Sequence, residues 1–336
     1  MTSHEPVLQI KGLSTRFDTR AGSALAVDNV SLTLNAGETL CVVGESGCGK
    51  SITALSVMGL VPRPGTIIGG QVLFRGDDLR KKSERELAKV RGNLISMIFQ
   101  DPASALNPVH TVGRQIAEVF RLHKNMDKAQ AWRASVAMLD ATGIPDPESR
   151  MRAYPHEMSG GMAQRIMIAM ALACEPAVLI ADEPTTALDV TIQAQILDLM
   201  RNLQTKTGTA TILITHDLGI VAEMADFVAV MYAGQIVEYA DVKTLFKHPQ
   251  HPYTRALLRS IPVIGKHQEM LEVIEGRVPN LLHPPSGCLF APRCEARKQA
   301  DEPRCQQIKP DLLDLGNNQQ ARCWLLEQNM AGEAAS

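Results

Sequence analysis

Long apolar segments are missing from this sequence of 336 residues. A transmembrane helix needs a run of about 18 apolar residues, and no such run occurs. The nearest approach, residues 166–181, is interrupted by Glu175 and Pro176 and fits a helix, a turn and a strand. The polar N-terminus leads into no long apolar core, so no signal peptide is expected. These absences predict a cytoplasmic chain that reaches a membrane only through a partner.

An excess of basic residues is missing as well. The chain has 34 Lys and Arg against 36 Asp and Glu, which gives a formal net charge of −2. Nucleic-acid binding through bulk positive charge is therefore not expected. Internal repeats and low-complexity tracts are also lacking. A hydrophobic content of 45% is enough for a full core, and the length predicts one large domain with a smaller one.

Local patterns predict several elements. Continuous apolar runs predict buried strands at 94–99, 178–181 and 211–215, and residues 227–238 are typical of a hairpin. Apolar residues at helical spacing predict helices at 112–120 and 132–139, and an apolar helix is expected after Ser159, up to Cys174. Residues 16–22 are expected to be a loop, and the Pro- and Gly-rich residues 62–70 a connection.

One segment matches the pattern G-x-x-x-x-G-K-[ST] at every fixed position: Gly44-Glu45-Ser46-Gly47-Cys48-Gly49-Lys50-Ser51. It follows the apolar run 39–43 and precedes the helical pattern 52–58, which is the strand–loop–helix context of a phosphate-binding loop. Glycines allow successive N–H groups to face one anion, and the following helix adds its positive dipole end. We expect Lys50 to reach the β- and γ-phosphates of a nucleotide and the Ser51 hydroxyl to bind Mg²⁺.

Two adjacent carboxylates end a second apolar strand, residues 178–181. Neighbouring strand residues point to opposite faces, so Asp182 and Glu183 can do different work. We expect Asp182 to hold the Mg²⁺ shell and Glu183 to polarise an attacking water.

Three further candidates each have a functional and a structural interpretation. Phe17 precedes the phosphate-binding loop and fits either an adenine-stacking ring or a residue packed under a hairpin. Ser159, followed by Gly160 and Gly161, fits the bare N-terminus of an anion-binding helix or of a capped core helix. His216 follows the buried strand 211–215, at the sheet edge where ligands bind, although a lone histidine at such a place is usually structural.

Four of the seven cysteines lie in the last 49 residues: Cys288, Cys294, Cys305 and Cys323. In a cytosolic chain this clustering favours a metal or cluster site over disulfides. The spacing C-x5-C-x10-C-x17-C lacks the C-x2-C pairs of most zinc sites. Four thiolates can hold an iron–sulfur cluster, while zinc and unligated thiols remain alternatives.

Together, these segments resemble the ATP-binding subunits of ABC transporters, over roughly residues 5–262. The segment from Gly44 to Ser51 resembles Walker A, and residues 178–182 with Glu183 resemble Walker B and its catalytic glutamate. The remaining motifs are similar to the Q-loop at Gln100, the signature at Ser159-Gly160-Gly161-Met162, the D-loop at Ala187-Leu188-Asp189 and the switch histidine at His216. Met162 departs from the usual signature glutamine, which affects the signature's side-chain contact more than nucleotide binding.

The resemblance implies an α/β P-loop ATPase fold with a parallel core sheet, an antiparallel β subdomain and a helical subdomain at about 101–175, followed by a small cysteine-containing region at 263–336. It also implies that two such domains pair head to tail, each ATP lying between one Walker A and the partner's signature. Asp189 would bridge the two sites, Gln100 would sense Mg²⁺ and the γ-phosphate, and His216 would hold the γ-phosphate. One motif set in this chain therefore requires a second ATPase.

Two segments resemble the peptide and nickel importer branch of this family: residues 99–108, and 251–258 with the sequence His-Pro-Tyr-Thr-Arg-Ala-Leu-Leu. The chain is similar to the larger ATPase of dipeptide and oligopeptide importers. This resemblance implies two transmembrane permease subunits, an extracytoplasmic binding protein, a peripheral position on the inner membrane, and a [4Fe–4S] cluster on the four cysteines. Peptide is the first choice of cargo, with nickel, glutathione or sugar as alternatives. A soluble ABC ATPase or an exporter subunit is a more remote alternative.

Overall fold

The computed structural model describes residues 6–185, 189–260 and 274–327 of the chain. They form two compact units, each assembled from separate stretches of sequence. Unit 1 comprises the described residues up to Gln9, Thr33–Thr39 and Leu73–Ile214. Unit 2 comprises Ile10–Leu32, Leu40–Val72 and the described residues from Thr215 onwards. The domain boundary near residue 262 stays a prediction.

In unit 1, three buried strands run parallel: β6 (Ile95–Ile98), β7 (Val178–Asp182) and β8 (Ala210–Ile214). β7 lies between the other two, and its last residue, Asp182, is opposite Ile214. All residues of these strands are buried, which explains their continuous apolar sequences. The strands predicted in these places are confirmed.

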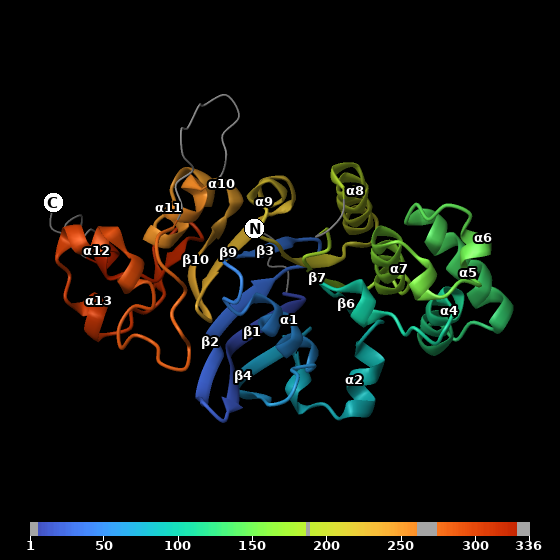
Figure 1. Ribbon diagram of the computed structural model, residues 1–336, viewed down its shortest axis with the longest axis horizontal. Coiled ribbons are helices and arrows are strands. Elements are labelled where there is room, and N and C mark those ends of the chain that lie inside the picture. The colour runs from blue at the N-terminus through green and yellow to red at the C-terminus, as the bar shows by residue number, and fades with distance from the viewer. Residues whose placement is uncertain (1–5, 186–188, 261–273, 328–336) are drawn as a thin grey trace. The chain divides into compact units, whose positions relative to one another are not determined.

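Three helices of unit 1 pack against one another (Figure 1): α4 (Val112–His123), α5 (Lys128–Ala141) and α7 (Gly160–Leu172). Side chains cap their N-termini by accepting hydrogen bonds from backbone N–H groups, at Thr111, Asp127 and Ser159. Apolar residues at helical spacing form the core between them, including Val112, Ile116, Phe120, Leu139 and Ile166. The helices predicted from that spacing, α4 and α5, are confirmed, as is the apolar helix predicted after Ser159.

The other elements of unit 1 are mostly short: β5 (Asp77–Asp78), η1 (Leu79–Lys81), α2 (Glu84–Val90), α3 (Pro102–Ala105), α6 (Pro147–Arg150), η2 (Pro155–Glu157) and α8 (Val190–Thr207).

Unit 2 holds most of a β layer and the strand that leads into the phosphate-binding loop. The layer has the strand order β2 (Gly22–Leu34), β1 (Leu8–Thr19), β4 (Gly65–Phe74). The leading strand is β3 (Thr39–Val43), which pairs in parallel with β9 (Phe227–Tyr232) from Leu40 opposite Phe227 to Val43 opposite Val230.

The remaining elements of unit 2 follow β9. β10 (Gln235–Asp241) forms the predicted hairpin with β9 and pairs on its other side with β12 (Gln320–Ala321), which pairs with β11 (Leu313–Asp314). The helices are α1 (Lys50–Met58), α9 (Leu218–Met224), α10 (Val242–Lys247), α11 (Pro252–Arg259), η3 (Ala291–Arg293), α12 (Glu295–Ala300) and α13 (Arg304–Gln307). Among the described residues, no helix combines the length and hydropathy required to cross a membrane.

Two segments predicted as loops are partly strands. Residues 16–22 were expected to be a loop, but β1 continues to Thr19 and β2 begins at Gly22. The Pro- and Gly-rich residues 62–70 were expected to be a connection, but β4 begins at Gly65. A Cβ on Gly70, where φ is +86°, would lie 2.5 Å from the carbonyl oxygen of Gly12. Glycine therefore serves here to let two strand backbones approach closely.

Candidate active site

The phosphate-binding loop joins β3 to α1, as predicted. Three of its glycines have positive φ, namely 152° at Gly44, 76° at Gly47 and 106° at Gly49. A Cβ on Gly49 would lie 2.3 Å from the carbonyl oxygen of Ala26. The loop conformation therefore depends on glycine at this position. Ser46 is exposed and Cys48 is buried.

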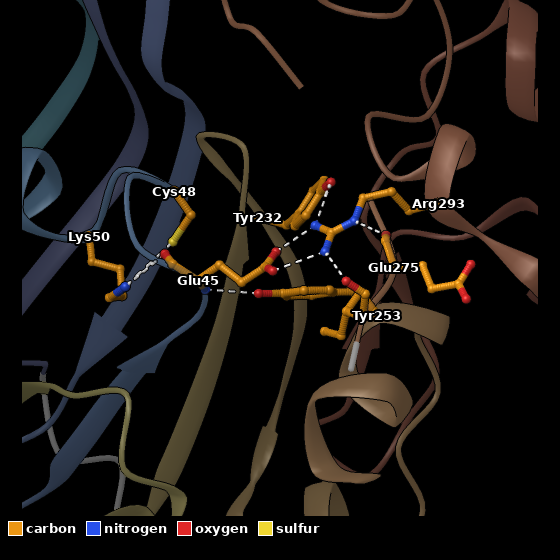
Figure 2. Close-up of polar contacts among 8 residues, drawn as sticks. Glu45, Cys48, Lys50, Tyr232, Tyr253, Glu275 and Arg293 are labelled. Atoms are coloured by element: carbon orange, nitrogen blue, oxygen red, sulfur yellow. Dashed lines mark hydrogen bonds and ion pairs between the residues drawn. The ribbon is translucent and has the colours of Figure 1, made fainter. Parts of the chain in front are cut away.

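Lys50 lies at the first position of α1 and folds over its own loop (Figure 2). Its side chain is buried, and Nζ donates hydrogen bonds to the carbonyl oxygens of Gly44 at 2.7 Å and Glu45 at 3.0 Å. The N-cap residue, Gly49, has no side chain with which to cap the helix, and the first turn carries no acidic residue. The positive end of α1, with the half-buried Ser51 beside Lys50, therefore suits an anion.

The two carboxylates at the end of β7 take different positions. Asp182 is the last strand residue and is 4% exposed. Glu183 is half-buried, has φ of +48°, and donates its N–H to the carbonyl oxygen of Ile214 at 2.9 Å. Gln100, just beyond β6, donates from Nε2 to the Glu183 carboxylate at 3.1 Å. The structure thus brings the predicted Q-loop glutamine and the predicted catalytic glutamate together.

Ser159 caps α7, as predicted, by accepting a hydrogen bond from the Met162 N–H at 3.3 Å. Ser159 and Gly160 are exposed, and Gly161 is half-buried. One turn further on, Gln164 is buried and donates from Nε2 to the Pro184 carbonyl oxygen at 2.6 Å. This bond ties the predicted signature helix to the residue that follows Glu183.

The other predicted site residues are dispersed. Asp189 is exposed and caps α8, accepting from the Ile192 N–H at 3.0 Å. His216 is exposed. Phe17 is half-buried in β1 with its ring against Gly65, whose Cβ would lie 2.7 Å from it. That contact agrees with the packing interpretation, and adenine stacking stays a prediction.

The predicted site residues are divided between the two units. The loop from Gly44 to Ser51, Phe17 and His216 belong to unit 2. Gln100, Ser159 to Gly161, Asp182, Glu183 and Asp189 belong to unit 1. The joint geometry of the two sets stays a prediction, and Ala187 and Leu188 lie outside the described residues.

Comparison with known proteins adds to this geometry. Residues 27–186 match the family model described as ABC transporter, and residues 237–300 match the one described as Oligopeptide/dipeptide transporter, C-terminal region. The dipeptide transport ATP-binding protein DppD of Bacillus subtilis is 50% identical over 325 residues, which cover 96% of each chain. The oligopeptide transport ATP-binding protein OppD of Haemophilus influenzae is 50% identical over 320 residues, 95% of this chain and 97% of that protein. The chain belongs to the ABC transporter ATP-binding proteins.

Solved structures agree with this assignment. An ATP-binding cassette, solved as a dimer in a post-hydrolysis state with ADP and Pi, matches with a TM-score of 0.64 at 24% identity, over 70% of this chain and 98% of that one. The protein cbiO1 of Clostridium perfringens, part of an ABC transporter complex, matches with a TM-score of 0.60 at 26% identity, over 73% and 92%. The predicted fold class is confirmed, and the chain is an ABC-type ATPase.

The four C-terminal cysteines of this ABC ATPase are free thiols. Burial raises the pKa of each, to about 11 at Cys305 and about 12 at Cys323. Cys288 and Cys294 add to the rise at both of these thiols. Four thiols are the donor type that iron–sulfur clusters use. Their placement does not match a site, however, because no three His, Cys, Asp or Glu side chains in the described part of the chain are grouped to hold a metal.

Two residues at the phosphate-binding loop were missed by the sequence analysis. The Tyr253 hydroxyl accepts a hydrogen bond from the Glu45 N–H at 2.9 Å, and Arg293 forms an ion pair with the Glu45 carboxylate at 2.6 Å. Tyr253 lies in the segment 251–258, whose sequence indicates only a resemblance to the importer branch. For Arg293 the sequence offered only its place next to Cys294.

Proposed function

We propose that the chain is the ATP-hydrolysing subunit of a membrane ABC importer that takes up dipeptides or oligopeptides. The observation that supports this cargo is the match of residues 237–300 to the oligopeptide/dipeptide transporter C-terminal region. Relatives named for dipeptide and oligopeptide transport, at about half identity across nearly the whole chain, point the same way.

In this proposal, Lys50 and the N–H groups at the start of α1 bind the ATP phosphates. Glu183 orients the water that attacks the γ-phosphate, and Gln100 keeps the Glu183 carboxylate in place through their hydrogen bond at 3.1 Å. His216 holds the γ-phosphate, and Phe17 stacks on the adenine.

Mg²⁺ is proposed at oxygen donors from the same motifs: the Ser51 hydroxyl, the buried Asp182 carboxylate and the Gln100 amide. Hard oxygen ligands of this kind suit Mg²⁺. When bound, the ion would neutralise charge that develops on the phosphates.

The second ATPase of the complex is proposed to supply the other half of each site. Ser159, Gly160 and Gly161 of one subunit would face the nucleotide on the other, and Asp189 would link the two sites. The further partners are two permease subunits and an extracytoplasmic binding protein, and the chain would lie on the cytoplasmic face of the inner membrane.

Affinity purification of the chain from detergent-solubilised native membranes tests this function. We expect two membrane subunits and a second ATPase to co-purify, and ATP hydrolysis to rise when peptide-loaded binding protein is added. Membrane subunits without peptide stimulation would retain the importer and move the cargo to nickel, glutathione or sugar. A preparation free of membrane proteins would contradict the importer.

We also propose a [4Fe–4S] cluster on Cys288, Cys294, Cys305 and Cys323. The support is the resemblance together with the four thiols, which are the donor type that such clusters use, and cluster binding would have to draw these sulfurs together. Anaerobic purification should give about four iron and four sulfide per chain, and Cys305→Ser should lower both. Cys174→Ser is the matched control, since Cys174 lies outside the group. Stoichiometric zinc, or no metal at all, would contradict the cluster.

A further inference from the structure

The acidic residue of the phosphate-binding loop, Glu45, is held by an arginine from the far end of the chain (Figure 2). Arg293 donates to both carboxylate oxygens, from Nη1 at 2.6 Å and from Nη2 at 3.0 Å. The Arg293 side chain is 4% exposed and that of Glu45 28%. A bidentate ion pair with one buried partner has a more fixed geometry and is stronger than an exposed salt bridge.

Arg293 is itself fixed on several sides. Nε donates to the Glu275 carbonyl oxygen at 2.8 Å, Nη2 to that of Ile274 at 3.0 Å, and Nη1 to the Tyr232 hydroxyl at 3.3 Å. The guanidinium carbon also lies 6.0 Å from the centre of the Phe290 ring. The planar guanidinium group, with its five N–H donors, makes all of these contacts at once, which the single ammonium group of lysine cannot do.

Tyr253 holds the backbone of the same loop residue. Its hydroxyl accepts the Glu45 N–H at 2.9 Å, and its side chain is fully buried. The ring packs against Tyr232, with centroids 4.7 Å apart, and against Phe290 at 5.4 Å. The aromatic group thereby fixes where the hydroxyl lies.

The backbone carbonyl group of Glu45 contacts Lys50 rather than Arg293 or Tyr253. Its carbonyl oxygen accepts from Lys50 Nζ, which also binds the Gly44 carbonyl oxygen. Glu45 thus joins Arg293 and Tyr253 to the ammonium group assigned to the phosphates. Arg293 also neutralises the one carboxylate in a loop that has to bind an anion.

We propose that Arg293 and Tyr253 are positioning residues for ATP, which hold the start of the phosphate-binding loop through Glu45. The inference rests on the proposed role of Gly44 to Ser51 in binding phosphate. Both residues contact the loop at Glu45, so in this proposal they act through the loop.

The test measures the dissociation constant of a fluorescent ATP analogue with Mg²⁺ on the purified full-length chain. Arg293→Ala should raise it by about tenfold, because the Glu45 carboxylate is left unpaired beside the phosphates. Arg293→Lys should recover only part of the affinity, since the charge remains and the fork is lost. In the assembled transporter, the loss should appear in KM for ATP more than in kcat.

A double-mutant cycle separates positioning from general stabilisation. In a Glu45→Ala background, Arg293→Ala should change the dissociation constant by less than about twofold. Tyr253→Phe removes a single oxygen and should weaken binding about threefold. If Arg293→Ala fails to fold, Tyr253→Phe still tests the proposal. The control is Arg304→Ala, because Arg304 pairs with Glu302 and Glu327 of the same region.

Unchanged affinity in both Arg293→Ala and Tyr253→Phe would overturn the proposal. An Arg293→Ala effect that persists undiminished in the Glu45→Ala background would overturn it too. Failure of the wild-type chain to bind the analogue would instead refute the nucleotide role of the loop, so the two failures are distinguishable.

Discussion

At the scale of single residues, Glu183, the proposed catalytic carboxylate, is held in a defined position. It follows a buried strand, its N–H is bound to the Ile214 carbonyl oxygen, and its carboxylate accepts from Gln100. Replacing the carboxylate with an amide retains an acceptor for Gln100 and removes the charged group that is proposed to orient the attacking water.

We therefore expect Glu183→Gln to bind ATP within about twofold of wild type and to lose at least about 100-fold in kcat. Nucleotide titration and phosphate release measure the two quantities. Glu175→Gln, which changes an exposed glutamate in the turn before β7, should match wild type. Near-normal turnover by Glu183→Gln would remove this residue from the mechanism.

Gly49, in contrast, is required because it has no side chain. Its φ is 106°, and a Cβ would lie 2.3 Å from the Ala26 carbonyl oxygen. Both the backbone conformation and the lack of space therefore exclude alanine. Gly49→Ala should lower the free energy of unfolding by about 2–4 kcal/mol and abolish ATP binding.

Denaturant unfolding checks the Gly49 prediction. Gly69→Ala is the control, because a Cβ there meets only Ser14 and Gly12 atoms at 3.9 Å or more. Its effect should stay under about 1 kcal/mol. Equal stability of the two variants would show that the loop tolerates a side chain at position 49.

At the scale of elements, a buried hydrogen bond from Gln164 ties α7 to the carbonyl oxygen of Pro184, two residues beyond the end of β7. Gln164→Met should lower the free energy of unfolding by about 1–2 kcal/mol, since that carbonyl loses this donor. It should also lower kcat, because Pro184 follows Glu183. The exposed Gln71→Met in β4 is the control. A kcat equal to that of the control would mean that the bond is only structural.

The elements predicted from sequence were those with a strong local pattern. Continuous apolar runs located β6, β7 and β8, and helical spacing located α4 and α5, because burial imposes these patterns. Strand ends were placed poorly where the chain is polar or glycine-rich, as at Thr19 and Gly65, since pairing with a distant strand overrides local preference there.

The site residues also differ in whether a local sequence pattern reveals them. The loop from Gly44 to Ser51 was recognisable because its residues are adjacent in the sequence. Tyr253 and Arg293 were not, because they lie 208 and 248 residues from Glu45, and no local pattern encodes such contacts.

At the scale of the whole molecule, one buried histidine should set part of the acid stability. His251 caps α11, with Nδ1 accepting from the Tyr253 N–H at 3.0 Å. Burial, with Arg322 and Arg255 nearby, lowers its pKa from about 6.5 to about 3. The unfolded chain therefore binds more protons between these values, and stability falls as the pH falls.

From pH 7 to pH 5, His251 should remove about 2 kcal/mol from the free energy of unfolding. His251→Asn keeps a side-chain oxygen that can cap α11, and it should flatten this dependence. Denaturant unfolding at several pH values measures the slope. His248→Asn, an exposed neighbour, should leave the slope unchanged. An undiminished slope in His251→Asn would assign the acid sensitivity to another group.

The ion pair between Glu45 and Arg293 can form only late in the synthesis of the chain. The two residues are 248 positions apart, and synthesis at about 5–20 residues per second separates their emergence from the ribosome by roughly 10–50 s. Until then the loop is translated but lacks the arginine that holds it. A nascent chain, or one ended early by a stop codon, therefore carries the whole loop motif without its distal support. On the proposed role of Arg293, such a chain should bind ATP more weakly than the complete subunit.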